Sequence, residues 1–342
     1  MSQVQGFRYA AAPLDAVLAA LRAAGEPTRL RLMALLAEGE LNVTDLTEIL
    51  GQSQPRISRH LKLLAEAGLI ERQREASWAF FRLAESEPGA SLARAILDRL
   101  DPNDPQILRD CERLEEVREQ RSRKAAAYFT THAESWDQIR ALHIEESNVE
   151  RAIREAVGPA PIRALLDLGT GTGRIIELFG EQADRAVGVD ASHEMLAVAR
   201  ANLARAGMSR AQLRHGDVYA LPVPPNSFDL VVVHQVLHFL DDPQRAIREA
   251  ARALAPGGRL LVVDFAPHGV EELRDAHAHR RLGFSKDSIE QWLRQAGLET
   301  ELHRTLPPPD GDAAKLTVSL WLARDTRVIT DIPPSSPDRA FA

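Results

Sequence analysis

Residues 165–174, LLDLGTGTGR, constrain the fold of this sequence more than any other stretch. The apolar run LLDL is typical of a buried strand, three alternating glycines follow it, and an amphipathic helix pattern begins at Arg174. A strand, a glycine turn and a helix in this order form the first unit of a parallel α/β sheet. Glycines at such a turn let a ligand approach the backbone closely, and the start of the helix supplies N–H donors. The stretch therefore predicts an α/β fold with a ligand at the turn.

The C-terminal half continues the alternation of strand and helix patterns. RAVGVDAS (185–192) carries Asp190, 17 residues after Gly173, where a carboxylate can accept hydrogen bonds from a ribose diol. Asp217 follows a third strand pattern, and further patterns occupy 228–233, 256–265 and an expected antiparallel pair at 299–304 and 316–323. The glycine loop alone fits either a dinucleotide or S-adenosylmethionine. A dehydrogenase is disfavoured, because it would carry GxGxxG and a second coenzyme-binding half.

Residues 124–324 resemble class I S-adenosylmethionine-dependent methyltransferases of the UbiE type, through LLDLGTGTGR, VGVDAS, HGDV, FDLVVVHQVLHFLDD and APGGRLLVVDF. The resemblance implies a seven-stranded Rossmann-like sheet that binds S-adenosylmethionine or S-adenosylhomocysteine. It also implies that KAAAYFTTHAESWDQIR (124–140) forms a lid over the cofactor through Tyr128 and Trp136. The residues that it assigns to the methionine part, ribose, adenine and pocket wall are Asp167, Gly169, Gly171, Gly173, Asp190, Ala191, Met195, Asp217, Val218, His234 and Tyr128.

Residues 26–84 predict a winged helix-turn-helix, with three short helix patterns followed by the strand patterns LIERQR and WAFFRL. Thr44 and Ser53 are the expected N-caps of the second and third helices. From Ser53 to Arg82 the chain carries six Lys and Arg against three Glu, a net charge of +3, whereas the whole chain carries −7. A local basic face suits a DNA groove. The predicted DNA-binding residues are Gln54, Arg56, Ser58, Arg59, His60 and Lys62 of the helix, and Arg72 and Arg74 of the wing.

Residues 10–84 resemble the ArsR family of transcriptional regulators, through EPTRLRLMALL, SQPRISRHLKLLAEAGLI and SWAFFRL. The resemblance implies a double-stranded DNA operator and a homodimer, formed here through 14–23 and 91–100. Many members bind metals through cysteines in an ELCVCDL motif, but this chain reads ELNVTDL, with Asn42 and Thr44 at the cysteine positions. Neither side chain replaces a thiolate for a soft metal. No metal is therefore expected there, and the inducer must act elsewhere.

Four parts are expected along the 342 residues: a winged-helix and dimerisation domain at 10–100, a helical linker and lid at 101–158, the methyltransferase domain at 159–325 and a disordered tail at 326–342. No apolar run approaches the ~20 residues of a membrane span. The single cysteine, Cys111, suits a reducing compartment. We therefore expect a cytoplasmic protein with no membrane partner.

The sequence leaves open whether the cofactor is used for chemistry or only sensed. Methyl transfer needs positioning above all, and a general base only if the acceptor is a hydroxyl or a phenol. The candidates for such a base are His234, His238 and Asp264. His268, His277 and His279 admit a metal site, although solvated or hydrogen-bonded histidines fit better. Two functions remain: a regulator that senses S-adenosylmethionine or S-adenosylhomocysteine, or an active small-molecule methyltransferase with an autoregulatory DNA-binding domain.

Overall fold

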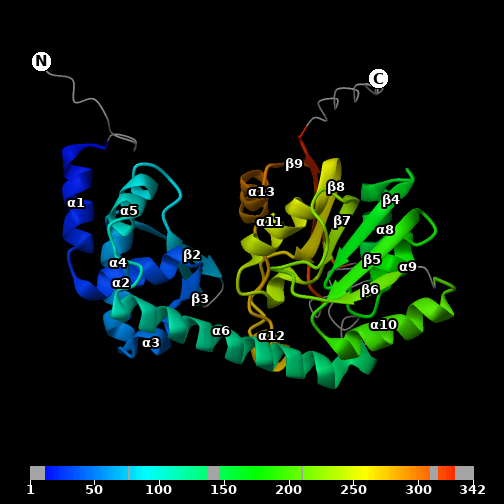
Figure 1. Cartoon of the computed structure of the whole chain (residues 1–342), viewed down its shortest axis with the longest axis horizontal. Helices are drawn as coiled ribbons and strands as arrows, with labels where there is room; N and C mark the ends of the chain where they lie inside the picture. The colour runs from blue at the N-terminus through cyan, green and yellow to red at the C-terminus, as the bar shows by residue number, and fades with distance from the viewer. Residues whose placement is uncertain (1–11, 76–77, 137–145, 209–210, 309–314, 328–342) are drawn as a thin grey trace, which may run out of the picture. The chain divides into compact units, whose positions relative to one another are not determined.

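The computed structural model describes residues 12–75, 78–136, 146–208, 211–308 and 315–327, which form two compact units (Figure 1). The N-terminal unit contains Met1–Phe129, His238–Pro243 and Pro267–Gly283. The sheet unit contains Thr130–Leu237, Gln244–Ala266 and Phe284–Ala342. Two segments from within the predicted methyltransferase domain therefore belong to the N-terminal unit.

The N-terminal unit has the helices and the hairpin of a winged helix-turn-helix. Its helices are α1 (Leu14–Ala24), α2 (Pro27–Ala37), α3 (Val43–Leu50), α4 (Gln54–Glu66), α5 (Gly89–Leu97), α6 (Pro105–His132, which passes into the sheet unit after Phe129) and α12 (Glu272–Ala276). Its strands β1 (Leu41–Asn42), β2 (Ile70–Glu75) and β3 (Trp78–Leu83) form an antiparallel sheet in the order β1-β3-β2.

Capping chemistry sets where α3 begins. Asn42 is the N-cap: its side chain accepts a hydrogen bond from the Asp45 amide at 3.0 Å, and the Asp45 carboxylate accepts one from the Asn42 amide at 3.4 Å. The expectation that Thr44 caps this helix is wrong, because Thr44 lies within the first turn. Gly51 ends the helix in the left-handed region, at φ 61°. Ser53 occupies the N-cap position of α4, as expected, but its side chain makes no capping hydrogen bond.

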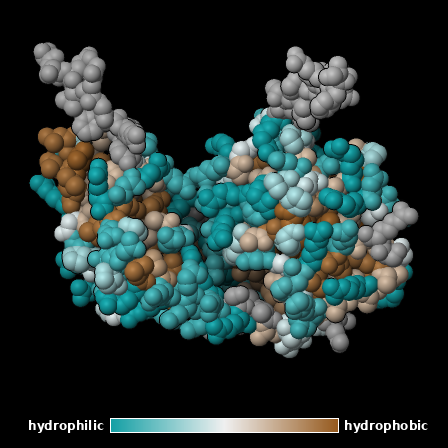
Figure 2. All heavy atoms as spheres, viewed as in Figure 1, coloured by the Kyte–Doolittle hydropathy of each residue, from teal (hydrophilic) through white to brown (hydrophobic). Residues whose placement is uncertain are grey.

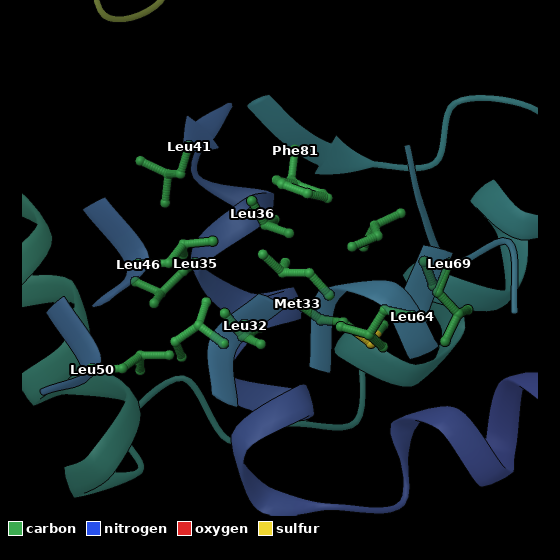
Figure 3. Close-up of a cluster of buried hydrophobic side chains, with 14 of the residues drawn as sticks. Leu32, Met33, Leu35, Leu36, Leu41, Leu46, Leu50, Leu64, Leu69 and Phe81 are labelled. Carbon is green, nitrogen blue, oxygen red and sulfur yellow. The ribbon is translucent and has the colours of Figure 1, made fainter. Parts of the chain in front are cut away.

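One apolar cluster holds the N-terminal unit together. Figure 3 shows leucines from α2, α3 and α4 pointing toward one another, with Phe81 of β3 beside them. Leu32 and Met33 of α2 are fully buried in this cluster, and Leu114 of α6 joins it from far along the chain. The apolar spacing of each helix therefore places one face in a shared core.

The sheet unit is a seven-stranded α/β fold, as the sequence predicted. Its strands lie in the order β6-β5-β4-β7-β8-β10-β9, with β10 antiparallel to both of its neighbours and the others parallel. The strands are β4 (Ile162–Leu168), β5 (Ala183–Asp190), β6 (Gln212–His215), β7 (Phe228–His234), β8 (Leu254–Phe265), β9 (Leu298–Leu306) and β10 (Val318–Asp325). Strand order reverses between β4 and β7, which is where this architecture binds ligands.

Helices lie on both faces of this sheet (Figure 1). They are α8 (Glu146–Val157), α9 (Arg174–Phe179), α10 (His193–Arg205), α11 (Pro243–Ala253) and α13 (Lys286–Gln295), with short 3-10 turns at η1 (Ala133–Ser135) and η2 (Leu237–Phe239). The central strands β4 and β7 are therefore buried on both faces, which explains their nearly continuous apolar sequences. Among the described residues, no helix is long and apolar enough to cross a membrane.

We expect Leu61→Ala to destabilise the N-terminal unit by about 2–5 kcal/mol, because Leu61 is fully buried in its core. Leu63 on the same helix is 38% exposed, so Leu63→Ala is the matched control, with an expected change of about 0.5 kcal/mol. Native-state hydrogen exchange of the α4 amides measures this, since two units need not unfold together. Equal opening free energies in the two variants would contradict the assigned core.

Candidate cofactor site and DNA-reading helix

The glycine turn follows β4 and is tied to the end of β5. The amides of Gly169 and Thr170 both donate to the Val189 carbonyl, at 2.8 and 3.0 Å. Gly169, Gly171 and Gly173 have φ values of 66°, 52° and 88°, in the left-handed region that favours glycine. The backbone path itself therefore explains the alternating glycines.

A neighbouring side chain also leaves no room for a larger residue at Gly169, whereas Gly171 has only ordinary van der Waals contacts. A Cβ on Gly169 would lie 2.4 Å from Cγ2 of Val236, which follows β7. A Cβ on Gly171 would lie 3.8 Å from Nε1 of Trp136, a residue predicted to cover the cofactor. The glycines thus leave bare backbone between these two side chains, which is compatible with the ligand approach that the sequence predicts.

Asp190 at the end of β5 joins the turn to the start of α10. Its carboxylate accepts hydrogen bonds from the Gly171 amide and the Ser192 amide, each at 2.8 Å. Burial raises the pKa of this carboxyl, whereas the amide donors and the nearby His215 act to lower it. Two oxygens offer about four acceptor positions, so a carboxylate with these two bonds can still accept from a ribose diol. The acceptor oxygens of Asp190 therefore fit the ribose hydroxyls of an adenosine ligand.

Asp167, assigned by resemblance to the methionine part, is 1% exposed. Its Oδ2 accepts a hydrogen bond from Thr170 Oγ1 at 2.6 Å, inside the turn. This bond holds the turn against the last residues of β4.

The residues expected around adenine lie on α10 and after β6. Ala191 is exposed and Met195 is buried at the start of α10. Asp217 is exposed, its Oδ1 accepts from the Tyr219 amide at 2.9 Å, and Val218 beside it is 8% exposed. Asp190 pairs with His215 across β5 and β6, so both acidic positions follow neighbouring strands at one edge of the sheet.

Sequence reasoning missed a histidine pair at this edge. His193 and His215 stack with ring centroids 4.0 Å apart and planes 9° apart, and His215 Nε2 lies 3.0 Å from the Ala191 carbonyl oxygen. The available signal was that each histidine stands within three residues of a predicted cofactor aspartate.

The candidate bases are divided between the two units. His234 is half-buried at the end of β7, and Asp264 in β8 is completely buried, at 0% exposure. His238 belongs to the N-terminal unit, is 2% exposed and packs against His279, with ring centroids 4.3 Å apart.

Tyr128, predicted to cover the cofactor, also belongs to the N-terminal unit. Its hydroxyl lies 2.8 Å from Nδ1 of His277, and burial raises the pKa of Tyr128. Within the described ranges, no three His, Cys, Asp or Glu side chains gather to hold a metal.

The outward face of α4 carries most of the predicted DNA-binding side chains. Ile57, Leu61 and Leu64 are fully buried. The exposed side chains predicted to read DNA are Gln54, Arg56, Ser58, Arg59 and Lys62. Amide, guanidinium, hydroxyl and ammonium groups on one helix face can reach phosphates and base edges.

His60 differs from these neighbours, because its Nδ1 lies 3.6 Å from Oε2 of Glu26 at the start of α2. Burial and the surrounding arginines lower its pKa, while the Glu26 carboxylate acts in the opposite direction. On the wing, Arg72 of β2 is exposed, and Arg74 stands opposite Ala79, although its side chain lies outside the described part of the chain.

We expect Arg56→Ala and Arg59→Ala each to weaken binding to a duplex selected from a random pool by about 1–3 kcal/mol, through loss of groove contacts. Arg72→Ala should mainly reduce the slope of log affinity against log salt, by about 1. Fluorescence anisotropy at several salt concentrations measures both, with the exposed Arg109→Ala on α6 as control. Wild-type binding in all three variants would rule out this face.

We expect Gly169→Ala to lower the affinity for S-adenosylhomocysteine by about tenfold or more, which corresponds to about 1.4 kcal/mol, because Val236 or the turn must move. Gly207→Ala is the control: Gly207 has φ 74°, and no described heavy atom lies within 4 Å of its Cβ position. Isothermal titration calorimetry compares them. The steric assignment fails if both variants bind alike.

Two family models match this chain. Residues 26–72, from the start of α2 into the wing, match the model for bacterial regulatory proteins of the arsR family. Residues 166–262, from β4 to β8, match the model for a methyltransferase domain.

Individual relatives match the C-terminal part. The chain is 35% identical over 185 residues to 27-O-demethylrifamycin SV methyltransferase of Amycolatopsis mediterranei, covering 50% of this chain and 66% of that protein. It is 40% identical over 119 residues to demethylmenaquinone methyltransferase of Thermus thermophilus, covering 34% and 53%.

The uncharacterized methyltransferase YcgJ of Bacillus subtilis is 36% identical over 104 residues, covering 30% of this chain and 41% of that protein. The YcgJ crystal structure aligns with a TM-score of 0.44 and 19% identity, covering 52% of this chain and 98% of that one. The chain thus spans 41 to 66% of the length of these three relatives. Together with the winged-helix unit and the seven-stranded sheet, the matches identify an arsR-family helix-turn-helix at residues 26–72 and a methyltransferase domain at residues 166–262, with S-adenosylmethionine or S-adenosylhomocysteine as its cofactor.

Proposed function

We propose that this chain is a metal-independent transcriptional regulator whose methyltransferase domain senses S-adenosylmethionine or S-adenosylhomocysteine and couples that ligand to DNA binding. The observation that carries the proposal lies in the ELNVTDL stretch. Asn42, at a position where many ArsR proteins have a metal-binding cysteine, is 2% exposed and serves as the N-cap of α3. Thr44 is exposed on the same helix. The signal is therefore assigned to the cofactor turn.

Coupling requires that the ligand bind the DNA-bound and DNA-free conformations with different affinities, because equal affinities shift no equilibrium. A tenfold change in operator affinity corresponds to about 1.4 kcal/mol of such a difference. This coupling free energy is a small fraction of the binding free energy of a cofactor-sized ligand. Ligand binding at the glycine turn is therefore a sufficient source of it.

A homodimer fits the apolar surface of α1. Leu14, Leu18 and Leu21 recur at helical spacing and are 73%, 37% and 55% exposed, and Figure 2 shows apolar side chains gathered over this helix. A second copy packed on α1 and α5 would present two α4 helices to a two-fold operator in the cytoplasm. We assign residues 101–158 to the linker and lid, supported by Trp136 beside Gly171.

An active small-molecule methyltransferase is the second candidate, and the intact glycine turn supports it. In that case we assign the role of general base to His234, His238 or Asp264. A labelled methyl group from S-adenosylmethionine would then appear on a small acceptor in lysate, with release of S-adenosylhomocysteine. Unreacted, stoichiometrically bound cofactor with no labelled acceptor would count against turnover and leave the sensing function.

We expect S-adenosylhomocysteine or S-adenosylmethionine to change the affinity of the wild-type chain for its selected duplex by about fivefold or more. Asp190→Ala should abolish the response, because the ribose loses its acceptor and the turn loses its bond to the Gly171 amide. Asp184→Ala is the control, since Asp184 is exposed on the same strand. Gel-shift titrations across ligand concentrations that saturate calorimetric binding test this. Unchanged wild-type affinity at saturation would refute the sensing function.

A further inference from the structure

Two segments of the methyltransferase sequence are structural parts of the N-terminal unit. His238–Pro243 begins four residues after β7 ends, and Pro267–Gly283 begins two residues after β8 ends. Both therefore continue from the carboxyl ends of parallel strands, the edge at which this architecture holds ligands. Within the N-terminal unit they are joined to each other, because the Arg280 and Arg281 amides donate to the His238 carbonyl at 2.8 and 3.0 Å.

The first link to the winged helix is a cluster of two aspartates and two arginines around Asp45. Asp45 belongs to α3 and is 1% exposed. Its Oδ2 accepts a hydrogen bond from Arg280 Nη2 at 2.7 Å, and its Oδ1 accepts one from Arg121 of α6. The same two arginines pair with Asp241, Arg280 at 2.5 Å and Arg121 at 3.4 Å. Four chain segments thus meet in one charge-balanced cluster.

The second link is made by the next residue. Arg281 is 1% exposed, and its Nη1 lies 2.7 Å from Oε2 of Glu40, just before β1. Its guanidinium carbon also lies 4.4 Å from the ring centroid of Phe80 in β3, a cation–π distance. The wing strand and the start of α3 are therefore both held by consecutive arginines that belong to the methyltransferase sequence.

Buried pairs of this kind specify one arrangement more than they add stability. Removing Arg280 would leave the buried Asp45 carboxylate with Arg121 as its only charged partner in the cluster, and such a loss is costly for a buried carboxylate. Asp45 is also the reciprocal capping residue of α3, so a change at Arg280 acts directly on the helix that precedes α4. A displacement of Arg280 after β8 would therefore act on the cap of α3, the helix before the predicted DNA-reading helix.

We propose that the Arg280–Asp45 and Arg281–Glu40 pairs are the switch that transmits cofactor occupancy to the DNA-binding helices, through the segment Pro267–Gly283. The proposal rests on the sensing function proposed above and names its route. The ligand state that displaces the ends of β7 and β8 loosens the two pairs, and the opposite state engages them.

The test uses full-length Arg280→Gln and Asp45→Asn chains, with Arg304→Gln as the control, since Arg304 pairs with Glu155 near the surface of the sheet unit. Calorimetry gives the affinity for S-adenosylhomocysteine, and anisotropy gives the affinity for the selected duplex with and without it. We expect ligand affinity within about twofold of wild type in all three chains, but a ligand-induced change in DNA affinity below about twofold in the two cluster variants. The control should keep the wild-type response.

Hydrogen exchange keeps the test decisive if a cluster variant is poorly folded. In the wild-type chain, S-adenosylhomocysteine should change amide protection in both Pro267–Gly283 and α3. In Arg280→Lys, the change in Pro267–Gly283 should remain and the change in α3 should be lost. Folded cluster variants that keep the full DNA response, or protection of α3 that ignores the ligand, would overturn this route while leaving the sensing function intact. A wild-type chain whose DNA affinity ignores bound ligand would overturn both.

Discussion

The parallel pairing of β4 with β5 and β7 is the constraint on which the cofactor site depends. Leu168 lies opposite Val189 on one side and Val233 on the other, so the chain leaves three neighbouring strands at one edge of the sheet. Gly169 and Asp190 meet there because of this register. The hydrogen bond between the Asp190 carboxylate and the turn then closes a cradle of bare backbone, which no single strand could form.

The N-terminal unit shows a complementary use of buried charge. Its core is apolar, yet the unit also buries charged residues outside the apolar cluster, among them Asp45 and Arg281, each 1% exposed. Buried ion pairs contribute little net stability, but they select one geometry. In this chain such pairs join a segment following β8 to α3, and Arg281 also lies against the Phe80 ring of β3. The N-terminal unit thus contains a segment of the methyltransferase sequence that is bonded directly to its helix-turn-helix.

Local rules explain what could be read in advance and what could not. The three glycines and Asp190 were predicted, because left-handed turns and strand ends leave spacing signals. The N-cap of α3 was misassigned to Thr44, because Asn42 and Thr44 are both good caps and only the pairing of β1 with β3 keeps the chain extended through Asn42. The stacking of His193 on His215, the last residue of β6, was missed, since it depends on the register of β5 and β6.

The sequence by itself determined the two domains, the strand–glycine–helix turn and the basic face of α4, because each depends on residues within one or two turns or strands of each other. Only the tertiary structure decided that Arg280 meets Asp45, 235 residues earlier in the chain. Hydrophobic periodicity indicates which face of a helix or strand is buried, but it does not indicate which distant charged residue will pair with a charge on that element. Charged pairs form where folding removes water from both partners at once, and that is a property of the assembled core.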